Sequence, residues 1–386
     1  MIKVISDKKK ICIVILSRAN YGSIKTVLEE ITKSSKLTLQ IVLGGSAVLE
    51  KYGTLDEILK KDGFKANRKL SFMLDGENPE TMTKSTGLAI IEISTALKSL
   101  KPDFVLTVGD RYETMATTIC ATYMNIPLIH TMGGESSGTI DESIRHATTK
   151  FAHIHFPATK KAKNKIIKLG ENKKNVFFVG CPRIDLVKKT LTKKRSDLNK
   201  VLTGLGVGRE FNLNKDFLII MQYSVTTEYE DSKKQILNTL KAVTNFNIPT
   251  LVFWPNSDAG SNLISKGIRT WREKNFEKKF WFLKNLPTET FYELLKKAKC
   301  MVGNSSSGIR ECSYLGIPFV NVGTRQKNRE KGQNTINASN NPKDISKAIK
   351  KALKLKPKKS KIYGEGNAAK KIVKVLEKIR HINLQK

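Results

Sequence analysis

The chain has 386 residues, of which 69 are lysine or arginine and 35 are aspartate or glutamate, so its formal net charge is +34 at pH 7. This length favours two domains over one. No apolar run approaches the roughly 18 to 20 residues that a membrane-spanning helix needs, and the N-terminus lacks the cleavage pattern of a signal peptide. The sequence therefore predicts a cytoplasmic protein without a membrane segment.

The positive charge consists mainly of lysine on predicted helix faces, concentrated at residues 160–174, 188–200 and 347–378. Such an excess can serve nucleic-acid binding, but the chain has no finger spacing, no RGG tract and no basic segment interleaved with aromatics. We therefore expect solvated helix faces and no nucleic-acid partner. The five cysteines are scattered without CxxC spacing, which favours buried reduced thiols over disulfides or a zinc site.

The N-terminal half alternates strands and helices, a pattern that indicates right-handed crossovers and a parallel sheet. The periodicity is lost between residues 181 and 215, which is typical of a domain linker with at most one short helix. Strands are expected at residues 11–16, 37–43, 103–108, 128–131, 152–156 and 176–179, and helices most clearly at 82–100 and 112–124.

The alternation restarts in the C-terminal half, and the last predicted helix, residues 368–380, carries an apolar stripe that needs a surface to cover. We expect two Rossmann-like domains, residues 1–185 and 186–365, with residues 366–386 packing back on the first. Strands are expected at residues 217–221, 250–254, 280–283, 300–302 and 319–321, and helices at 228–244, 290–298 and 309–315.

Acidic residues follow two buried strands of the first domain. Asp110 and Glu135 each come after a strand within a glycine-containing turn, and Asp141 and Glu142 lie a few residues further on. The carboxyl ends of parallel strands form the crevice in which ligands bind, so these groups are candidate catalytic acids and bases. Two alternatives are structural: Asp110 could cap the following helix, and Asp141 and Glu142 could simply begin one.

Four of the five histidines, His130, His146, His153 and His155, lie close to these carboxylates in the chain. None of them has the spacing of a helical metal site, so we expect hydrogen-bonded histidines and no bound metal. Arg145 and His146 would form charged pairs with the neighbouring acidic groups and move their pKa values apart.

Two further turns are candidate phosphate sites. The turn at residues 17–22 contains Arg18 and opens a helix, whose N–H groups could hold a phosphate; ordinary turn formation is the alternative. In the second half, three serines precede Glu311, which could accept from ribose hydroxyls, and Arg325 adds a cation. Neither turn is a GxGxxG motif or a P-loop, so no NAD, ATP or other cofactor is expected.

A set of segments, taken together and in this order along nearly the whole chain, points to one known family: SRANYG, GDRYET, HTMGGESSGTIDESIRHATTKFAHIHF, VGCPRID, VTTE, WPNSDAGS, GNSSSGIRE and NVGTRQKNRE. In these segments the chain resembles the UDP-N-acetylglucosamine 2-epimerases, and more closely the hydrolysing branch that forms free N-acetylmannosamine. The resemblance implies a GT-B-type arrangement of two Rossmann-like domains, with the active site in the cleft between them and UDP held mainly by the C-terminal domain.

The resemblance implies that Asp110, Glu135 and the Asp141/Glu142 pair are catalytic. One departure is that Tyr223 and Ser224 precede VTTE, where related sequences commonly have His-Pro. The substrate-binding residues expected from these segments are Arg18, Arg111, Arg145, His146, Asn256, Ser305, Ser306, Ser307, Glu311 and Arg325.

The expected function is conversion of UDP-N-acetylglucosamine and water to N-acetylmannosamine and UDP, by elimination and then hydration, in sialic-acid-type biosynthesis. One alternative is the same reaction on UDP-2,4-diacetamido-2,4,6-trideoxyhexose, in a legionaminic-type pathway. A different class, a non-catalytic sugar-nucleotide or nucleic-acid binding protein, is the other alternative. The expected partners are a UDP-sugar and further copies of the chain, as a dimer or tetramer.

Overall fold

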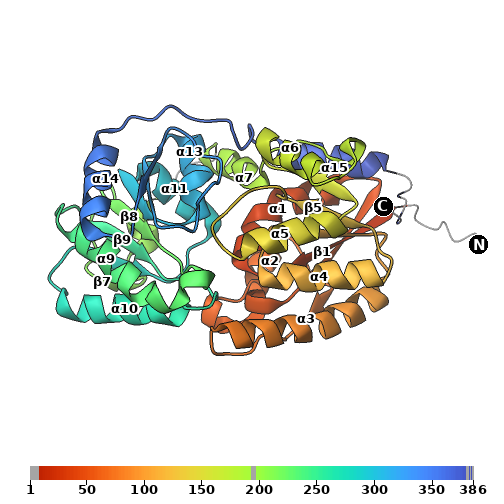
Figure 1. Ribbon diagram of the computed structural model, residues 1–386, viewed down its shortest axis with the longest axis horizontal. Helices are drawn as coiled ribbons and strands as arrows, with labels where there is room; N and C mark the ends of the chain where they lie inside the picture. Colours follow the sequence, from red (N-terminus) through yellow and green to blue (C-terminus); the bar gives the residue numbers. More distant parts are fainter. Residues whose placement is uncertain (1–7, 193–196, 380–381, 383, 385–386) are drawn as a thin grey trace, which may run out of the picture.

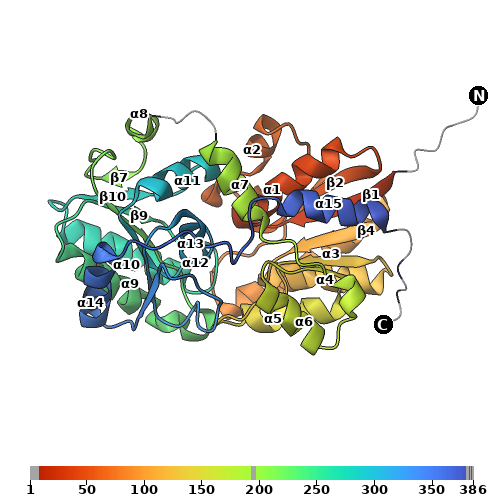
Figure 2. The same ribbon diagram turned by 90° about the horizontal axis from the view of Figure 1, so that it is seen from above.

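Two lobes lie side by side in the computed structural model, which describes residues 8–192, 197–379, 382 and 384 (Figures 1 and 2). Each lobe is built on a sheet with helices on both faces. Among the described residues, no helix has the length and apolar character needed to cross a membrane.

The first sheet has six parallel strands in the order β3-β2-β1-β4-β5-β6, which is the doubly wound order of a Rossmann domain. Its strands are β1 (Lys9–Ile15), β2 (Leu37–Leu43), β3 (Arg68–Lys69), β4 (Phe104–Val108), β5 (Leu128–Thr131) and β6 (Ile154–Phe156). Its helices are α1 (Arg18–Lys33), α2 (Asp56–Lys61), α3 (Pro79–Leu100), α4 (Tyr112–Tyr123), α5 (Asp141–Phe151), α6 (Lys160–Lys168) and α7 (Pro182–Leu191), with short 3-10 turns at Gly45–Val48, Glu50–Tyr52 and Lys173–Asn175.

The second sheet has seven strands in the order β13-β12-β11-β8-β9-β10-β7, and β7 runs antiparallel to β10 at its edge. The strands are β7 (Val207–Gly208), β8 (Leu218–Met221), β9 (Thr250–Phe253), β10 (Phe280–Leu283), β11 (Cys300–Gly303), β12 (Phe319–Val322) and β13 (Thr335–Ala338). The helices of this lobe are α8 (Leu198–Leu202), α9 (Ser232–Thr244), α10 (Ser261–Lys274), α11 (Thr288–Lys297), α12 (Ser306–Ile309), α13 (Glu311–Leu315) and α14 (Pro342–Lys354), and a 3-10 segment spans Thr226–Asp231. The last helix of the chain is α15 (Ala368–Lys378).

The central strands are apolar on both faces because helices cover both sides of each sheet. In β1, Ile11, Ile13 and Ile15 belong to one buried cluster, while Cys12 and Val14 belong to another that includes residues of α3 and α4. The first of these clusters continues into the second lobe. The two lobes therefore share one apolar core on one side of the molecule.

Helix α7 contacts both lobes, since it packs on α1 and also on α11. Residue 185, the expected end of the first domain, falls inside this helix. Helix α15 returns to the first lobe and lies against α1 and α7 (Figure 2). The carboxylate of Asp185 accepts from the backbone N–H groups of Ala368 at 2.9 Å and Ala369 at 2.7 Å, which satisfies donors at the start of α15.

The predicted two-sheet α/β fold and its long strands are confirmed, but four details of the prediction are wrong. Residues 176–179 form only an isolated bridge to β6. The expected linker contains α7, α8 and β7, and the predicted helix at 309–315 is broken at Arg310 into α12 and α13. The predicted helix at 228–244 begins as a 3-10 segment. Arg380, at the expected end of the last helix, lies outside the described residues.

Candidate active site

A pocket opens at the carboxyl ends of the strands, between the two lobes. Segments that follow β4, β5, β11 and β12 all reach it, so both lobes contribute to it. The lining residues are Gly109, Asp110, Met132, Ser137, Thr139, Asp141, Ser306, Arg310, Arg325, Gln326 and Arg329.

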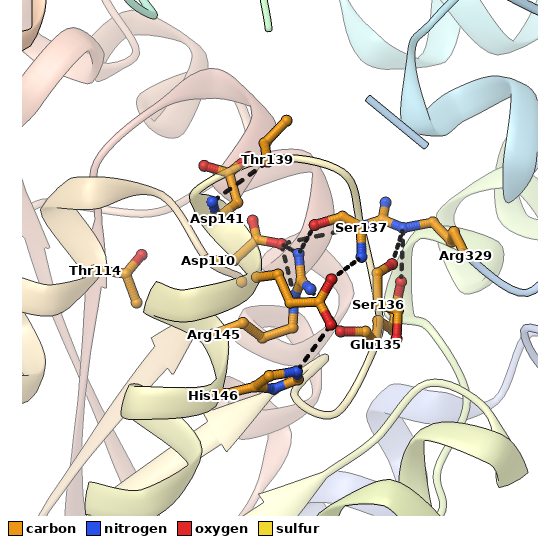
Figure 3. A network of polar contacts seen from close by, with 12 residues as sticks. Asp110, Thr114, Glu135, Ser136, Ser137, Thr139, Asp141, Arg145, His146 and Arg329 are labelled. Carbon is orange, nitrogen blue, oxygen red and sulfur yellow. Dashed lines mark hydrogen bonds and ion pairs between the residues drawn. The ribbon is translucent and has the colours of Figure 1, made fainter. Parts of the chain in front are cut away.

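Asp110 borders the pocket and is paired with arginine. Its carboxylate accepts from Nε of Arg145 at 2.9 Å and from Nη2 of the same residue, and Arg329 lies 3.8 Å away (Figure 3). Helix α4 begins at Tyr112 without a side-chain cap, so Asp110 does not cap it. Burial raises the pKa of Asp110, but the arginines outweigh burial and hold that pKa below its usual range. Asp110 is therefore ionised.

Asp141, the first residue of α5, borders the same pocket in a different electrostatic setting. Burial and the negative charge of Asp110 raise the pKa of Asp141 to about 6, although Arg325 and Arg145 act against this rise. Neighbouring carboxyl groups whose environments move their pKa values apart are typical of acid and base pairs in enzymes. The pocket thus combines one ionised carboxylate with one that retains its proton to a higher pH.

Replacing Asp141 with asparagine is expected to stabilise the protein at neutral pH. The folded-state pKa of about 6 is above the ordinary value of 3.8, so the native state binds more protons than the unfolded chain between these values, and stability falls as pH rises through them. Asparagine removes this loss. We expect Asp141→Asn to raise Tm by about 2 to 4 °C at pH 8 and by less at pH 5. Equal changes in Tm at both pH values would show that the pKa of Asp141 is not raised in the folded protein.

Glu135 lies beside the pocket and holds arginines of the second lobe. Both of its carboxylate oxygens accept from Nη2 of Arg310 at 2.9 Å, and Nε of Arg329 lies 3.4 Å from one of them. Its carbonyl oxygen accepts from Arg145 at 2.6 Å. Burial raises the pKa of Glu135, and Arg310 and Arg329 bring it below its ordinary value. The pair of Glu135 and Arg310 therefore joins the two lobes.

Glu142 and His146 lie outside the pocket lining, unlike Asp141. Glu142 accepts from Nζ of Lys165 at 2.9 Å and from the backbone N–H of Ser137 at 2.8 Å, and His146 lies 3.2 Å away. Burial raises the pKa of Glu142, but the hydrogen bonds from Lys165 and Ser137 lower it to about 2. Through these hydrogen bonds, Glu142 connects the segment before α5 with helix α6.

Three of the expected nucleotide-binding residues are serines at the start of α12. Ser305 accepts from the backbone N–H of Ser307, and Ser306 borders the pocket. Glu311 is fully buried, and its Oε1 accepts from Arg183 at 2.9 Å. Its Oε2 has no hydrogen-bond partner among the described residues. A ligand hydroxyl could satisfy this oxygen, and buried polar atoms generally have such a partner.

The remaining expected binding residues are divided between the pocket and the contact between the lobes. Arg325 borders the pocket, and its guanidinium lies 5.2 Å from the ring centre of Tyr223. Arg111 pairs with Asp258 of the second lobe at 2.6 Å, and Asn256 donates to the same carboxylate. Arg18 begins α1 and lies outside the pocket lining.

Two buried arginines, Arg310 and Arg329, and the partly buried Arg183 are absent from the site residues predicted from the sequence. All three lie within segments that carry the resemblance, VGCPRID, GNSSSGIRE and NVGTRQKNRE. Their position in these motifs could therefore have identified them as site residues. Their partners are distant in the chain, and only the fold brings them together. Arg183 follows Pro182 at the start of α7 and contacts Ser23 at 2.7 Å as well as Glu311.

The four histidines that the structure describes have protein partners. His130 lies 2.9 Å from the carbonyl oxygen of Gly109 and 3.2 Å from Thr149, and burial lowers its pKa to about 4. His155 lies 3.1 Å from Glu171. Among the described residues, no group of three or more His, Cys, Asp or Glu is arranged to hold a metal ion. All five cysteines are free and buried, as predicted.

Comparisons with known proteins confirm the family that the resemblance implied, but they do not support its N-acetylmannosamine-forming branch specifically. The family model described as UDP-N-acetylglucosamine 2-epimerase matches residues 29–377. A Campylobacter jejuni protein named GDP/UDP-N,N'-diacetylbacillosamine 2-epimerase (hydrolyzing) is 34% identical over 89% of this chain and 88% of its own length. A Legionella pneumophila protein named UDP-N,N'-diacetylbacillosamine 2-epimerase (hydrolyzing) is 32% identical over 96% of each chain. A Neisseria meningitidis protein named UDP-N-acetylglucosamine 2-epimerase is 30% identical over 90% of this chain and 88% of its own length.

Solved structures support the fold. A UDP-N-acetylglucosamine 2-epimerase from Neisseria meningitidis, bound to UDP-N-acetylglucosamine, superimposes with a TM-score of 0.79 over 96% of this chain and 100% of that one, at 18% identity. An enzyme of the same name from Methanocaldococcus jannaschii gives a TM-score of 0.80 over 95% and 99% of the two chains, also at 18% identity. The two Rossmann-like lobes thus have the GT-B-type arrangement that was expected.

Proposed function

Because the chain belongs to the UDP-N-acetylglucosamine 2-epimerase family, we propose that it is a hydrolysing 2-epimerase of UDP-N,N'-diacetylbacillosamine, a UDP-2,4-diacetamido-2,4,6-trideoxyhexose. The products would be UDP and the free sugar inverted at C2. The names of the relatives at 34% and 32% identity support this substrate. The observation that carries the chemistry is that Asp110 and Asp141, whose pKa values are moved in opposite directions, border one pocket.

The reaction needs a base because the C2–H bond must break. That proton is not acidic in the ground state, but it becomes so as UDP departs from C1 and positive charge develops on the ring. Asp110 is the proposed base, since arginine pairing keeps it ionised. Loss of the proton and of UDP gives a 2-acetamidoglycal.

Hydration completes the reaction and needs an acid. A proton returns to C2 on the opposite face, and water adds its oxygen to C1, so the sum is UDP-sugar plus water giving sugar plus UDP. Asp141 is the proposed proton donor because it keeps its proton to a pH of about 6. General acids and bases of this kind typically contribute about 100- to 10,000-fold each.

The leaving diphosphate needs positive charge, and the second lobe supplies it. Arg310, Arg325 and Arg329 all border the pocket. Glu135 contacts Arg310 and Arg329, so their orientation is fixed before charge develops on the departing UDP. Preorganised charge of this kind is often the largest contribution to catalysis.

A second candidate substrate is UDP-N-acetylglucosamine, with N-acetylmannosamine as the product. The relative from Neisseria meningitidis favours it by name, at 30% identity. Release of UDP from both sugar nucleotides tests the choice. We expect kcat/KM to be at least about 10-fold higher for the diacetamido-trideoxy substrate, a difference that one or two altered sugar substituents can produce. A preference for UDP-N-acetylglucosamine would favour the second candidate, and release from neither would contradict the enzyme proposal.

A further inference from the structure

One lining residue differs in character from the rest of the pocket. Gly109 has no side chain, and the other lining residues except Met132 carry a hydroxyl, amide, carboxyl or guanidinium group. Met132 is thus the one residue with an apolar side chain among the described residues that line this pocket, and it is buried, with 5% exposure, at the edge of the apolar core. It follows β5 directly and lies between Asp110 and Glu135 in the chain.

Met132 is held in an uncommon backbone conformation. Its φ is +60°, in the left-handed region that side chains of this size seldom adopt. Its backbone N–H donates to the carbonyl oxygen of Phe156 at 2.9 Å, and its sulfur lies 3.7 Å from the thiol sulfur of Cys181. Left-handed residues that the surrounding structure holds in place occur often at ligand sites.

The two candidate substrates differ in a way that matches this pocket. Both carry an acetamido group at C2, and the diacetamido sugar carries a second one at C4. The arginine, serine, threonine and glutamine side chains of the pocket can form hydrogen bonds with these acetamido groups. At C6, the trideoxy sugar has a methyl group where N-acetylglucosamine has a hydroxymethyl group, and a hydroxyl placed against a thioether would lose its hydrogen bonds to water without a strong replacement.

We propose that Met132 is a specificity-determining residue that contacts the C6 methyl group of a 6-deoxy sugar nucleotide and so selects it over the 6-hydroxy sugar. This inference rests on the proposed function. Methionine suits the role because its flexible, polarizable side chain packs against small apolar groups.

Two variants test this role. Met132→Gln keeps the length of the side chain but places an amide against the methyl group. We expect it to lower kcat/KM for UDP-N,N'-diacetylbacillosamine about 10- to 100-fold, while kcat/KM for UDP-N-acetylglucosamine stays within about threefold. Met132→Leu, which keeps an apolar group of similar volume, is expected to change either value by less than about fivefold. Unchanged affinity for UDP checks that both variants fold.

The outcomes separate this inference from the proposal on which it rests. Equal losses with both sugar nucleotides in Met132→Gln would overturn the C6 contact, since they would indicate packing or a contact with the shared C2 acetamido group. An unchanged ratio with full activity would overturn it as well. If the wild-type protein releases UDP from neither sugar nucleotide, both proposals are overturned.

Discussion

Asp110→Asn is expected to reduce kcat by about 100- to 10,000-fold, the range of a lost general base. Asparagine preserves the size of the side chain, but it cannot take the C2 proton. UDP should still bind, because the resemblance implies that the second lobe holds most of the nucleotide. Steady-state kinetics and calorimetric titration with UDP measure the two quantities separately.

A matched control tests whether the loss of kcat is specific to Asp110. Asp216 is paired with Lys299 on the surface at 3.1 Å, and its side chain is 67% exposed. Asp216→Asn makes the same chemical change far from the pocket and should leave kcat unchanged. If Asp110→Asn weakened UDP binding as much as turnover, or retained most of the turnover, Asp110 would not be the base.

Arg310→Met is expected to lower the free energy of unfolding by about 3 to 5 kcal/mol, because it leaves the carboxylate of Glu135 buried without its main partner. Glu135 is 5% exposed and Arg310 is 6% exposed, so the unpaired carboxylate stays largely shielded from bulk water. The guanidinium also lies 5.8 Å from the ring centre of Tyr363, and this contact is lost too. Denaturant unfolding measures the change.

A double variant shows whether Arg310→Met loses stability because a carboxylate is left unpaired or because packing is lost. Glu135→Gln in the Arg310→Met background removes the unpaired carboxylate, so we expect it to recover at least about 1 kcal/mol, as coupled neighbours do in mutant cycles. Additive losses in the four-protein cycle would mean that the two side chains do not depend on each other.

Much of the fold is predictable because buried parallel strands are short apolar runs. β1, β4 and β8 are of this kind, and their predicted ends lie within about two residues of the observed ones, inside the usual error of sequence-based boundaries. The edge strands β3 and β7 are too short to give a periodicity. Helix α7 falls in the predicted linker because its polar residues obscure an apolar face that the structure packs against both α1 and α11.

The site is predictable as a set of carboxylates, but their division of roles is not. Asp141 and Glu142 are adjacent on α5, and adjacent helical residues point about 100° apart. One can therefore reach the pocket while the other meets Lys165 of α6. The pairing of Glu135 with Arg310 spans 175 positions in the chain, and no local pattern reveals it. The predicted dimer or tetramer and the domain boundaries stay predictions.

Proton NMR of the reaction in heavy water tests the central claim most directly. The protein would be incubated with UDP-N,N'-diacetylbacillosamine, and UDP release would be followed together with the signal of the C2 proton. If Asp110 removes that proton and solvent-derived hydrogen returns through Asp141, each released UDP will accompany one free sugar that is inverted at C2 and carries deuterium there. Release of UDP with the original C2 proton retained would mean simple hydrolysis at C1 and would contradict the elimination mechanism.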